Sequence, residues 1–303
     1  IYIGAANGGV WRSDDTGQTW HSLMEAFDLN PTTPASDSLA VGAIALDLAN
    51  PDRVYVGSGE GAGAAYFGVG PIVTNNGTAN PPTWTTEPAA PGSNSLAGTA
   101  FYALAVDPAT PDRVVAATYR GVYRRELINP IDPLSGFHWA QKTMGGVTNQ
   151  RVTSVVVAAS GGITTFYAAR QQGPVYNSND GHTWNPIGAG FPAAVGRISL
   201  AVRQDNPTVV YALVENGSVY RLDIADGTWR TITGVPAGFT STQGWYDLAI
   251  AVAPNNINRI YLGGSTIFSG GDWSGSLYRC EVTVSGATVS MTPTYIGNSV
   301  HPD

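Results

Sequence analysis

The chain has 303 residues, of which 43% are hydrophobic and 12% charged, so it can bury a sizeable core. Its 37 Gly, 20 Pro and 14 Tyr are typical of a turn-rich, aromatic β-protein, and the single Cys280 excludes an internal disulfide. The net charge of −7, with Arg124-Arg125 as the longest basic run, argues against a nucleic-acid partner. No apolar run reaches the roughly 18 residues that a membrane span needs.

Along the chain, the strongest pattern is a pair of short apolar strands joined by a turn rich in Pro, Asn and Asp. Clear copies occupy 44–57, 104–117, 200–213 and 250–263, a weaker copy occupies 155–169, and the chain opens inside another. One position of the second strand is held by Tyr2, Tyr55, Val115, Tyr167, Tyr211 and Tyr261. We therefore predict six repeat units of about 50 residues.

Each unit continues with a third strand and a Trp-bearing segment. The third strands are predicted at 8–13, 120–126, 173–178 and 217–223. Four short antiparallel strands in about 50 residues are typical of one blade of a β-propeller, so the predicted fold class is all-β. The only helix candidate, 21–29, is too short to form more than a turn or two.

The predicted domain organisation is a single β-propeller over 1–303. We place blade repeats near 1–40, 41–98, 99–150, 151–195, 196–244 and 245–290. Residues 291–303 would begin a further blade or supply a closing strand. Either this tail closes a six-bladed ring, or the chain is a processed or partial piece of a propeller with seven or more blades, with further domains or chains outside it.

Two tracts have the spacing of an Asp-box. The first is SDDTGQTW at 13–20, the second is SNDGHTW at 178–184, and a remnant, DGTW, ends at Trp229. In such a turn the Asp accepts hydrogen bonds from backbone amides, the Gly supplies a positive φ, and the Trp packs on the sheet. The residues predicted to have this structural role are Ser13, Asp15, Gly17, Thr19, Trp20, Ser178, Asp180, Gly181, Thr183 and Trp184.

With these motifs the chain resembles the BNR/Asp-box repeat propellers, which include sialidases, bacterial xyloglucanases and the sortilin-type ectodomain. The tract TQGWYDLAIAVAP at 242–254 and VHPD at 300–303 resemble the closing blades of secreted bacterial members. The resemblance implies a propeller over nearly the whole length and a secreted or cell-surface location. It does not imply one function, because the group contains glycosidases, receptors and assembly factors.

Binding residues are expected where loops converge on a central funnel, since loops carry most binding residues on rigid scaffolds. Polar or aromatic residues stand just before predicted first strands and in the glycine-rich loop 57–70, which also holds Glu60. That loop lacks the helix and the Lys-Ser/Thr pair of a phosphate cradle. The predicted ligand-binding residues are Arg151, Arg197, Trp245, Tyr246, Asp247, Tyr66 and Phe67.

Two functions remain open at this point. A sialidase needs an arginine cluster, a Tyr nucleophile and carboxylates, and the chain supplies only some of these, with Tyr246 and Asp247 as candidates. The xyloglucanase-type enzymes that the chain resembles use a pair of Asp residues in a cleft between two propellers. Asp37 is a conceivable acid, but it lies in a tract typical of a solvated turn. The first hypothesis is a non-catalytic module that binds protein or glycan; the alternative is a secreted glycoside hydrolase.

No cofactor is predicted. The four His lack zinc-like spacing, and no D-x-D-x-D tract is present for calcium. If the tail lay beside Asp247, then His301, Asp303 and Asp247 could hold a divalent cation. The preferred interpretation is that His301 and Asp303 only cap the start of a strand.

Overall fold

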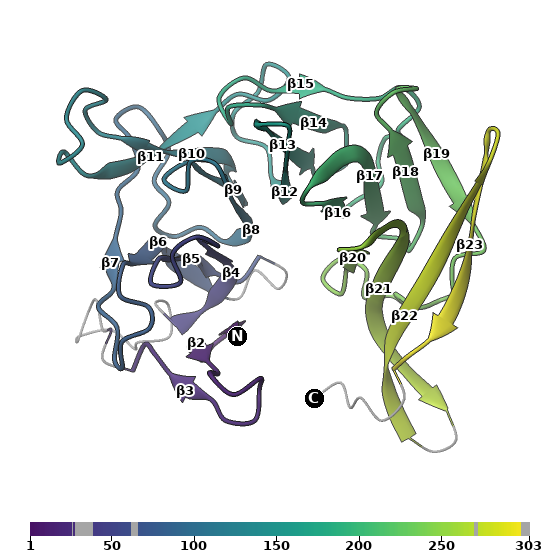
Figure 1. Cartoon of the computed structure of the whole chain (residues 1–303), viewed down its shortest axis with the longest axis horizontal. Coiled ribbons are helices and arrows are strands. Elements are labelled where there is room, and N and C mark those ends of the chain that lie inside the picture. The colour runs from purple at the N-terminus through teal and green to yellow at the C-terminus, as the bar shows by residue number, and fades with distance from the viewer. Residues whose placement is uncertain (26, 28–38, 62–65, 270–271, 298–303) are drawn as a thin grey trace. The chain divides into compact units, whose positions relative to one another are not determined.

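The computed structural model describes residues 1–25, 27, 39–61, 66–269 and 272–297 (Figure 1). Every element whose bounds are described is a β-strand, which confirms the predicted all-β class. The chain divides into two compact units. The first contains residues 1–155 and 179–184, and the second contains 156–178 and 185–303.

The first unit holds three antiparallel sheets that follow one another in the sequence. The first sheet has the order β1 (Tyr2–Ala5), β2 (Gly9–Arg12), β3 (His21–Ser22). The second has the order β4 (Val41–Leu46), β5 (Val54–Gly59), β6 (Phe67–Thr74), β7 (Thr85–Thr86). The third has the order β8 (Phe101–Val106), β9 (Val114–Thr118), β10 (Gly121–Leu127), β11 (Phe137–Lys142). Adjacent strands in each sheet are consecutive in sequence, as expected of propeller blades.

The remaining strands repeat this plan. The fourth sheet has the order β12 (Val152–Ser160), β13 (Ile163–Arg170), β14 (Val175–Ser178), β15 (Asn185–Pro186). The next group is β16 (Ile198–Arg203), β17 (Asn206–Val214), β18 (Val219–Asp223), β19 (Thr228–Thr233). The last group is β20 (Ala249–Ala253), β21 (Asn256–Ser269), β22 (Asp272–Ser285), β23 (Thr288–Tyr295). The five predicted strand pairs and the four predicted third strands are thus all present.

In three sheets, the repeated tyrosine of the second strand joins its sheet to the following one. Its hydroxyl donates a hydrogen bond of 2.9–3.0 Å to a carbonyl in the first turn of the next sheet or just after that turn, and the pairs are Tyr55–Pro111, Tyr167–Pro207 and Tyr211–Ile257. Burial raises the pKa of each of these tyrosines to about 12, so the donor proton is retained. Val115 replaces the tyrosine in the third sheet, where Arg124 Nε instead donates to Asp180 O at 2.8 Å.

Parallel bridges link outer segments of successive sheets. Single bridges occur at Ala89–Trp139, Met144–Trp184 and Ala189–Thr228. The longest link is the parallel pairing of β19 with β23, where Ile232 faces Val289 and Thr233 faces Ser290. This pairing merges the last two groups into one eight-stranded sheet, so β23 lies beside β19 within the second unit (Figure 1).

The hydrophobic cores lie between successive sheets. One core combines β17–β19 with β20–β23 and includes Tyr211, Ile232 and Cys280, all of which are at most 3% exposed. Another combines β5 and β6 with the third sheet around Phe101 and Trp139. The second sheet and the group β16–β19 each contribute to two such cores, so they are packed on both sides and their strands alternate poorly between polar and apolar residues.

The first predicted box forms a turn closed by side-chain hydrogen bonds between β2 and β3. Asp15 Oδ1 accepts from the amides of Gln18 and Thr19 at 2.9 and 2.8 Å, and Oδ2 accepts from Thr19 Oγ1 at 2.6 Å. Ser13 Oγ donates to Asp15 Oδ1 at 2.8 Å, Gly17 has a φ of 94°, and Trp20 Nε1 donates to Gly17 O.

The second predicted box has related bonds. Asp180 Oδ1 accepts from the amides of His182 and Thr183, and Trp184 Nε1 donates to Gly181 O. Ser178 is the last residue of β14, and Gly181 has a φ of 72°. In both places the motif fixes a turn between the third and fourth strands.

A third turn of this kind was missed by the sequence analysis. Between β6 and β7, Asn76 Oδ1 accepts from Thr74 Oγ1 at 2.7 Å and from the Thr83 amide at 2.8 Å. Trp84 follows, is buried, and donates to Leu23 O at 2.9 Å. The Asp-box spacing is not recognisable in the sequence here, because Asn76 replaces the Asp and an additional segment precedes Thr83.

One boundary differs from that expected, and one short segment forms the single turn that was expected. The predicted boundary at 290 falls inside β23, so residues 291–295 belong to the outermost strand of the last repeat; the tail at 298–303 lies outside the described residues. The segment 21–29 begins with β3 and then forms one turn, in which the Phe27 amide donates to Met24 O. Residues 26, 28 and 29 are outside the described part.

Candidate functional site

The predicted binding residues occupy one end of the sheets. In an antiparallel meander, the turns between second and third strands lie at the same end as the segments that lead into first strands. We term this end the site rim. The box turns lie at the opposite end, because they join third and fourth strands. The predicted binding residues are therefore separated from the structural boxes within each sheet.

Arg197 is held at the site rim of the second unit, immediately before β16. Its Nη1 donates to Tyr246 O at 2.6 Å and to Trp245 O at 3.3 Å. Its own amide donates to Glu215 Oε2 at 2.8 Å. The guanidinium thus fixes the backbone of the segment that leads into β20.

An aromatic pair projects from the same segment. The rings of Trp245 and Tyr246 are 4.4 Å apart and tilted by 58°, and Trp245 is 48% exposed. Gln243 Nε2 donates to the Tyr246 hydroxyl at 2.7 Å, and Gln243 Oε1 accepts from Ser265 Oγ. Tyr246 is therefore held by hydrogen bonds at its hydroxyl and at its backbone carbonyl, and its ring packs against the half-exposed indole of Trp245. We call Trp245 and Tyr246 the aromatic platform.

Asp247 follows the aromatic platform and is partly buried. Burial raises the pKa of its carboxyl group, and the positive charge of Arg197 offsets part of this effect. A carboxyl group in such surroundings keeps its proton to higher pH than an exposed one. This is the property required of a general acid, although glycoside hydrolysis needs a second carboxylate as well.

The first unit has its own cluster at the site rim. Phe67, at the start of β6, and Tyr119, in the β9–β10 turn, meet edge to face with centroids 6.1 Å apart. The Arg151 guanidinium lies 4.1 Å from the centroid of the Tyr119 ring. Both rings are almost 40% exposed, as is Tyr66, whose carbonyl accepts from the Glu60 amide. This cluster combines apolar faces with a positive charge.

The predicted site residues thus form two groups, one in each unit. Tyr119, Glu215 and Gln243 were not predicted as site residues. Tyr119 could have been found from the sequence, because it is an aromatic residue at the tip of a predicted hairpin. Asp37, His301 and Asp303 lie outside the described residues. Within the described part of the chain, no three His, Cys, Asp or Glu side chains gather closely enough to hold a metal ion.

Comparison with known proteins gives similarity of structure only. No protein-family model and no curated protein matches the sequence. An ancestral GH74 enzyme is similar over 99% of this chain and 37% of its own, with 19% identity and a TM-score of 0.67. The GH74 xyloglucanase from Xanthomonas campestris is similar over 96% of this chain and 43% of its own, with 20% identity and a TM-score of 0.62.

A third similar structure is the Cps50 (Swd1) β-propeller domain of Myceliophteria thermophila, with 14% identity and a TM-score of 0.50. It covers 87% of this chain and 76% of its own. The chain has a β-propeller fold. The chain spans less than half the length of the two GH74 proteins, and identities this low are informative about the fold alone. In the residues that the structure describes, no helix is long and apolar enough to cross a membrane.

Proposed function

We propose that the chain is a non-catalytic, extracellular β-propeller module that binds a glycan at its site rim. The observation that carries this proposal is the aromatic platform, where Trp245 is half exposed while Arg197 and Gln243 fix its surroundings. Sugar rings stack on aromatic faces, and a preorganised platform loses little entropy on binding. The location outside the cell follows from the resemblance to secreted propellers.

The second cluster supports the same ligand class. Phe67 and Tyr119 expose apolar ring area beside Arg151, which can donate hydrogen bonds to hydroxyl or carboxyl groups of a glycan. A protein ligand is the other partner class for such a rim, since aromatic residues and Arg are also enriched at protein interfaces. A glycan is favoured over a protein ligand because the exposed rings lie beside hydrogen-bonding groups whose positions are fixed by other contacts.

Trp245→Ala tests the proposal. Binding of xyloglucan oligosaccharides and of other soluble polysaccharides is measured by calorimetry for the wild type and the variant. We expect roughly a five- to thirtyfold loss of affinity, because stacking on one aromatic ring contributes on the order of 1–2 kcal/mol. The matched control is Trp273→Ala, which removes a 55% exposed Trp from β22. Equal affinities for wild type and Trp245→Ala would contradict the proposal.

A second candidate function is glycoside hydrolysis. The raised pKa of Asp247 and the likeness to GH74 proteins favour it. If it holds, wild-type protein cleaves polysaccharide or chromogenic glycosides, and Asp247→Asn abolishes the turnover, since the amide cannot donate the required proton. Asp205→Asn, which removes an exposed carboxylate paired with Arg203, serves as the control. Absence of turnover on the whole panel would remove this candidate.

A further inference from the structure

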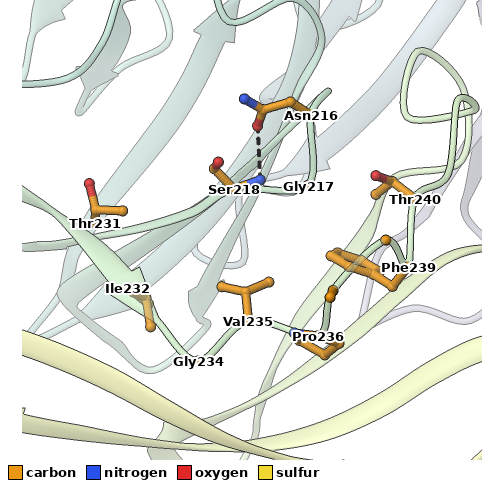
Figure 2. Close-up of a pocket in the computed structure, with 12 residues that line it drawn as sticks. Asn216, Gly217, Ser218, Thr231, Ile232, Gly234, Val235, Pro236, Phe239 and Thr240 are labelled. Carbon is orange, nitrogen blue, oxygen red and sulfur yellow. Dashed lines mark hydrogen bonds between the residues drawn. The ribbon is translucent and has the colours of Figure 1, made fainter.

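A cavity of about 300 Å³ lies in the second unit (Figure 2), and neither residue of the aromatic platform lines it. Its walls are the β17–β18 turn, the end of β19 and the segment 234–240 that leads away from β19. The two sites share the β17–β18 turn, where Glu215 binds Arg197 and Ser218 lines the cavity. The size is at the lower end for ligand pockets, which suits a single ring.

Three hydroxyl groups line the cavity without a hydrogen-bond partner among the described residues. They belong to Ser218, Thr231 and Thr240. Thr240 is only 3% exposed. The Thr240 hydroxyl oxygen is not fully buried, so from the cavity it can exchange a hydrogen bond with water for one with a ligand.

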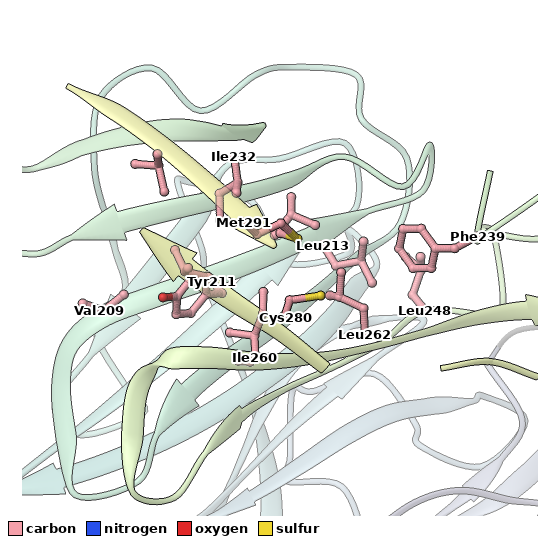
Figure 3. Close-up of a cluster of buried hydrophobic side chains, with 14 residues drawn as sticks. Val209, Tyr211, Leu213, Ile232, Phe239, Leu248, Ile260, Leu262, Cys280 and Met291 are labelled. Carbon is pink, nitrogen blue, oxygen red and sulfur yellow. The ribbon is translucent and has the colours of Figure 1, made fainter. Parts of the chain in front are cut away.

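The apolar side of the cavity is rigid. Phe239 contributes to the cavity and also to the core that contains Leu248 and Leu262 (Figure 3). Its carbonyl accepts from the Ser265 amide at 2.9 Å, and a Cβ at Gly264 would lie 2.4 Å from that oxygen. Val235 and Pro236 complete this side. The polar wall is fixed as well, because Asn216 Oδ1 accepts from the Ser218 amide at 2.9 Å (Figure 2).

The chemistry of the lining limits the ligand. No lining residue carries an ionisable side chain, so a charged ligand would lose its hydration without gaining a counter-charge. An extended peptide would need free backbone groups, but Ile232 and Thr233 already pair with β23. A lining that combines hydroxyl groups with apolar side chains matches a neutral ring that has hydroxyl groups on its rim and C–H groups on its face.

We propose that this cavity is a second binding site, which takes one neutral sugar residue. The proposal is independent of glycan binding at the aromatic platform, because the two sites use different side chains. Isotope-labelled protein is titrated with D-glucose, D-xylose and D-galactose into the millimolar range, and amide and methyl shifts are followed by NMR. At least one sugar should shift the signals of Ile232, Val235 and Thr240 in a saturable manner.

Two variants test the assignment. Thr240→Val keeps the shape and removes the hydroxyl, and it should weaken binding about five- to tenfold through the loss of one hydrogen bond. Ala237→Trp, at an exposed position in the lining, should block the cavity with little effect on folding. Thr292→Val, at an exposed position of β23, is the matched control and should bind as the wild type does.

Trp245→Ala separates the two proposals, since it should weaken polysaccharide binding at the platform and leave the monosaccharide shifts unchanged. The cavity site is overturned if no sugar produces saturable shifts. It is also overturned if Ala237→Trp leaves those shifts unchanged, or if the cavity signals respond only to a proline-rich peptide. Should Thr240→Val fail to fold, Ala237→Trp still decides the outcome.

Discussion

At the scale of single residues, two aspartates show how local surroundings set opposite properties. Hydrogen bonds from Thr19 and Ser13 hold the pKa of Asp15 well below its usual range. Burial raises the pKa of Asp247, which accepts no comparable set of donors. The first carboxylate is suited to closing a turn and the second to holding a proton.

Asp15 therefore predicts a pH-dependent stability difference. Because its pKa is lower in the folded than in the unfolded chain, its stabilising effect is present above about pH 4 and declines as the pH falls through the folded-state value. Asp15→Asn should lower the melting temperature at neutral pH, and the difference from the wild type should narrow below about pH 4.

Thermal melts monitored by circular dichroism between acidic and neutral pH measure this difference. The control is Asp14→Asn, which removes a neighbouring charge that pairs with Arg12 and does not contact the turn amides. A melting difference that stays constant with pH would contradict the assigned role of Asp15. Retained glycan binding in Asp15→Asn would agree with a purely structural turn.

At the scale of strands, the repeated tyrosine explains why the second strand keeps one aromatic position. In Tyr55, Tyr167 and Tyr211 the ring fills the core and the hydroxyl reaches the next turn. The sequence predicted these strands well, because their apolar runs and turn residues are contiguous. The turn at Asn76 was not predicted, because the insertion before Thr83 breaks the spacing of the motif. The outer strand β23 was not predicted in full either, because its threonines interrupt the apolar pattern.

Tyr55→Phe tests the tyrosine contact. The change leaves the ring in place but removes the donor to Pro111 O, so the free energy of unfolding should fall by about 1 kcal/mol. Chemical denaturation, with the slope compared between variants, measures the effect. Tyr66→Phe, at an exposed residue of the site rim, should change stability much less. Equal effects in the two variants would show that the Tyr55 hydroxyl contributes no more to stability than an exposed one.

At the scale of the whole chain, the repeat period predicted the β-propeller class, which the similar structures bear out. The candidate site was only partly predictable. Residues beside first strands, such as Arg197 and Tyr246, can be recognised from their order in each repeat. Tyr119 and Gln243 depend on contacts between segments distant in sequence, and the cavity around Thr240 is built from three separate segments, which no local pattern reveals.

The parallel pairing of β19 with β23 has a consequence for the behaviour of the protein in concentrated solution. An outermost strand normally presents unpaired amides and carbonyls, which can template association with another molecule. At Ile232 and Thr233 these groups are already engaged by Val289 and Ser290, and the bridge at Trp139 similarly covers part of β11. The repeats thus shield one another at the periphery, which protects a chain rich in β-structure against aggregation through its outer strands.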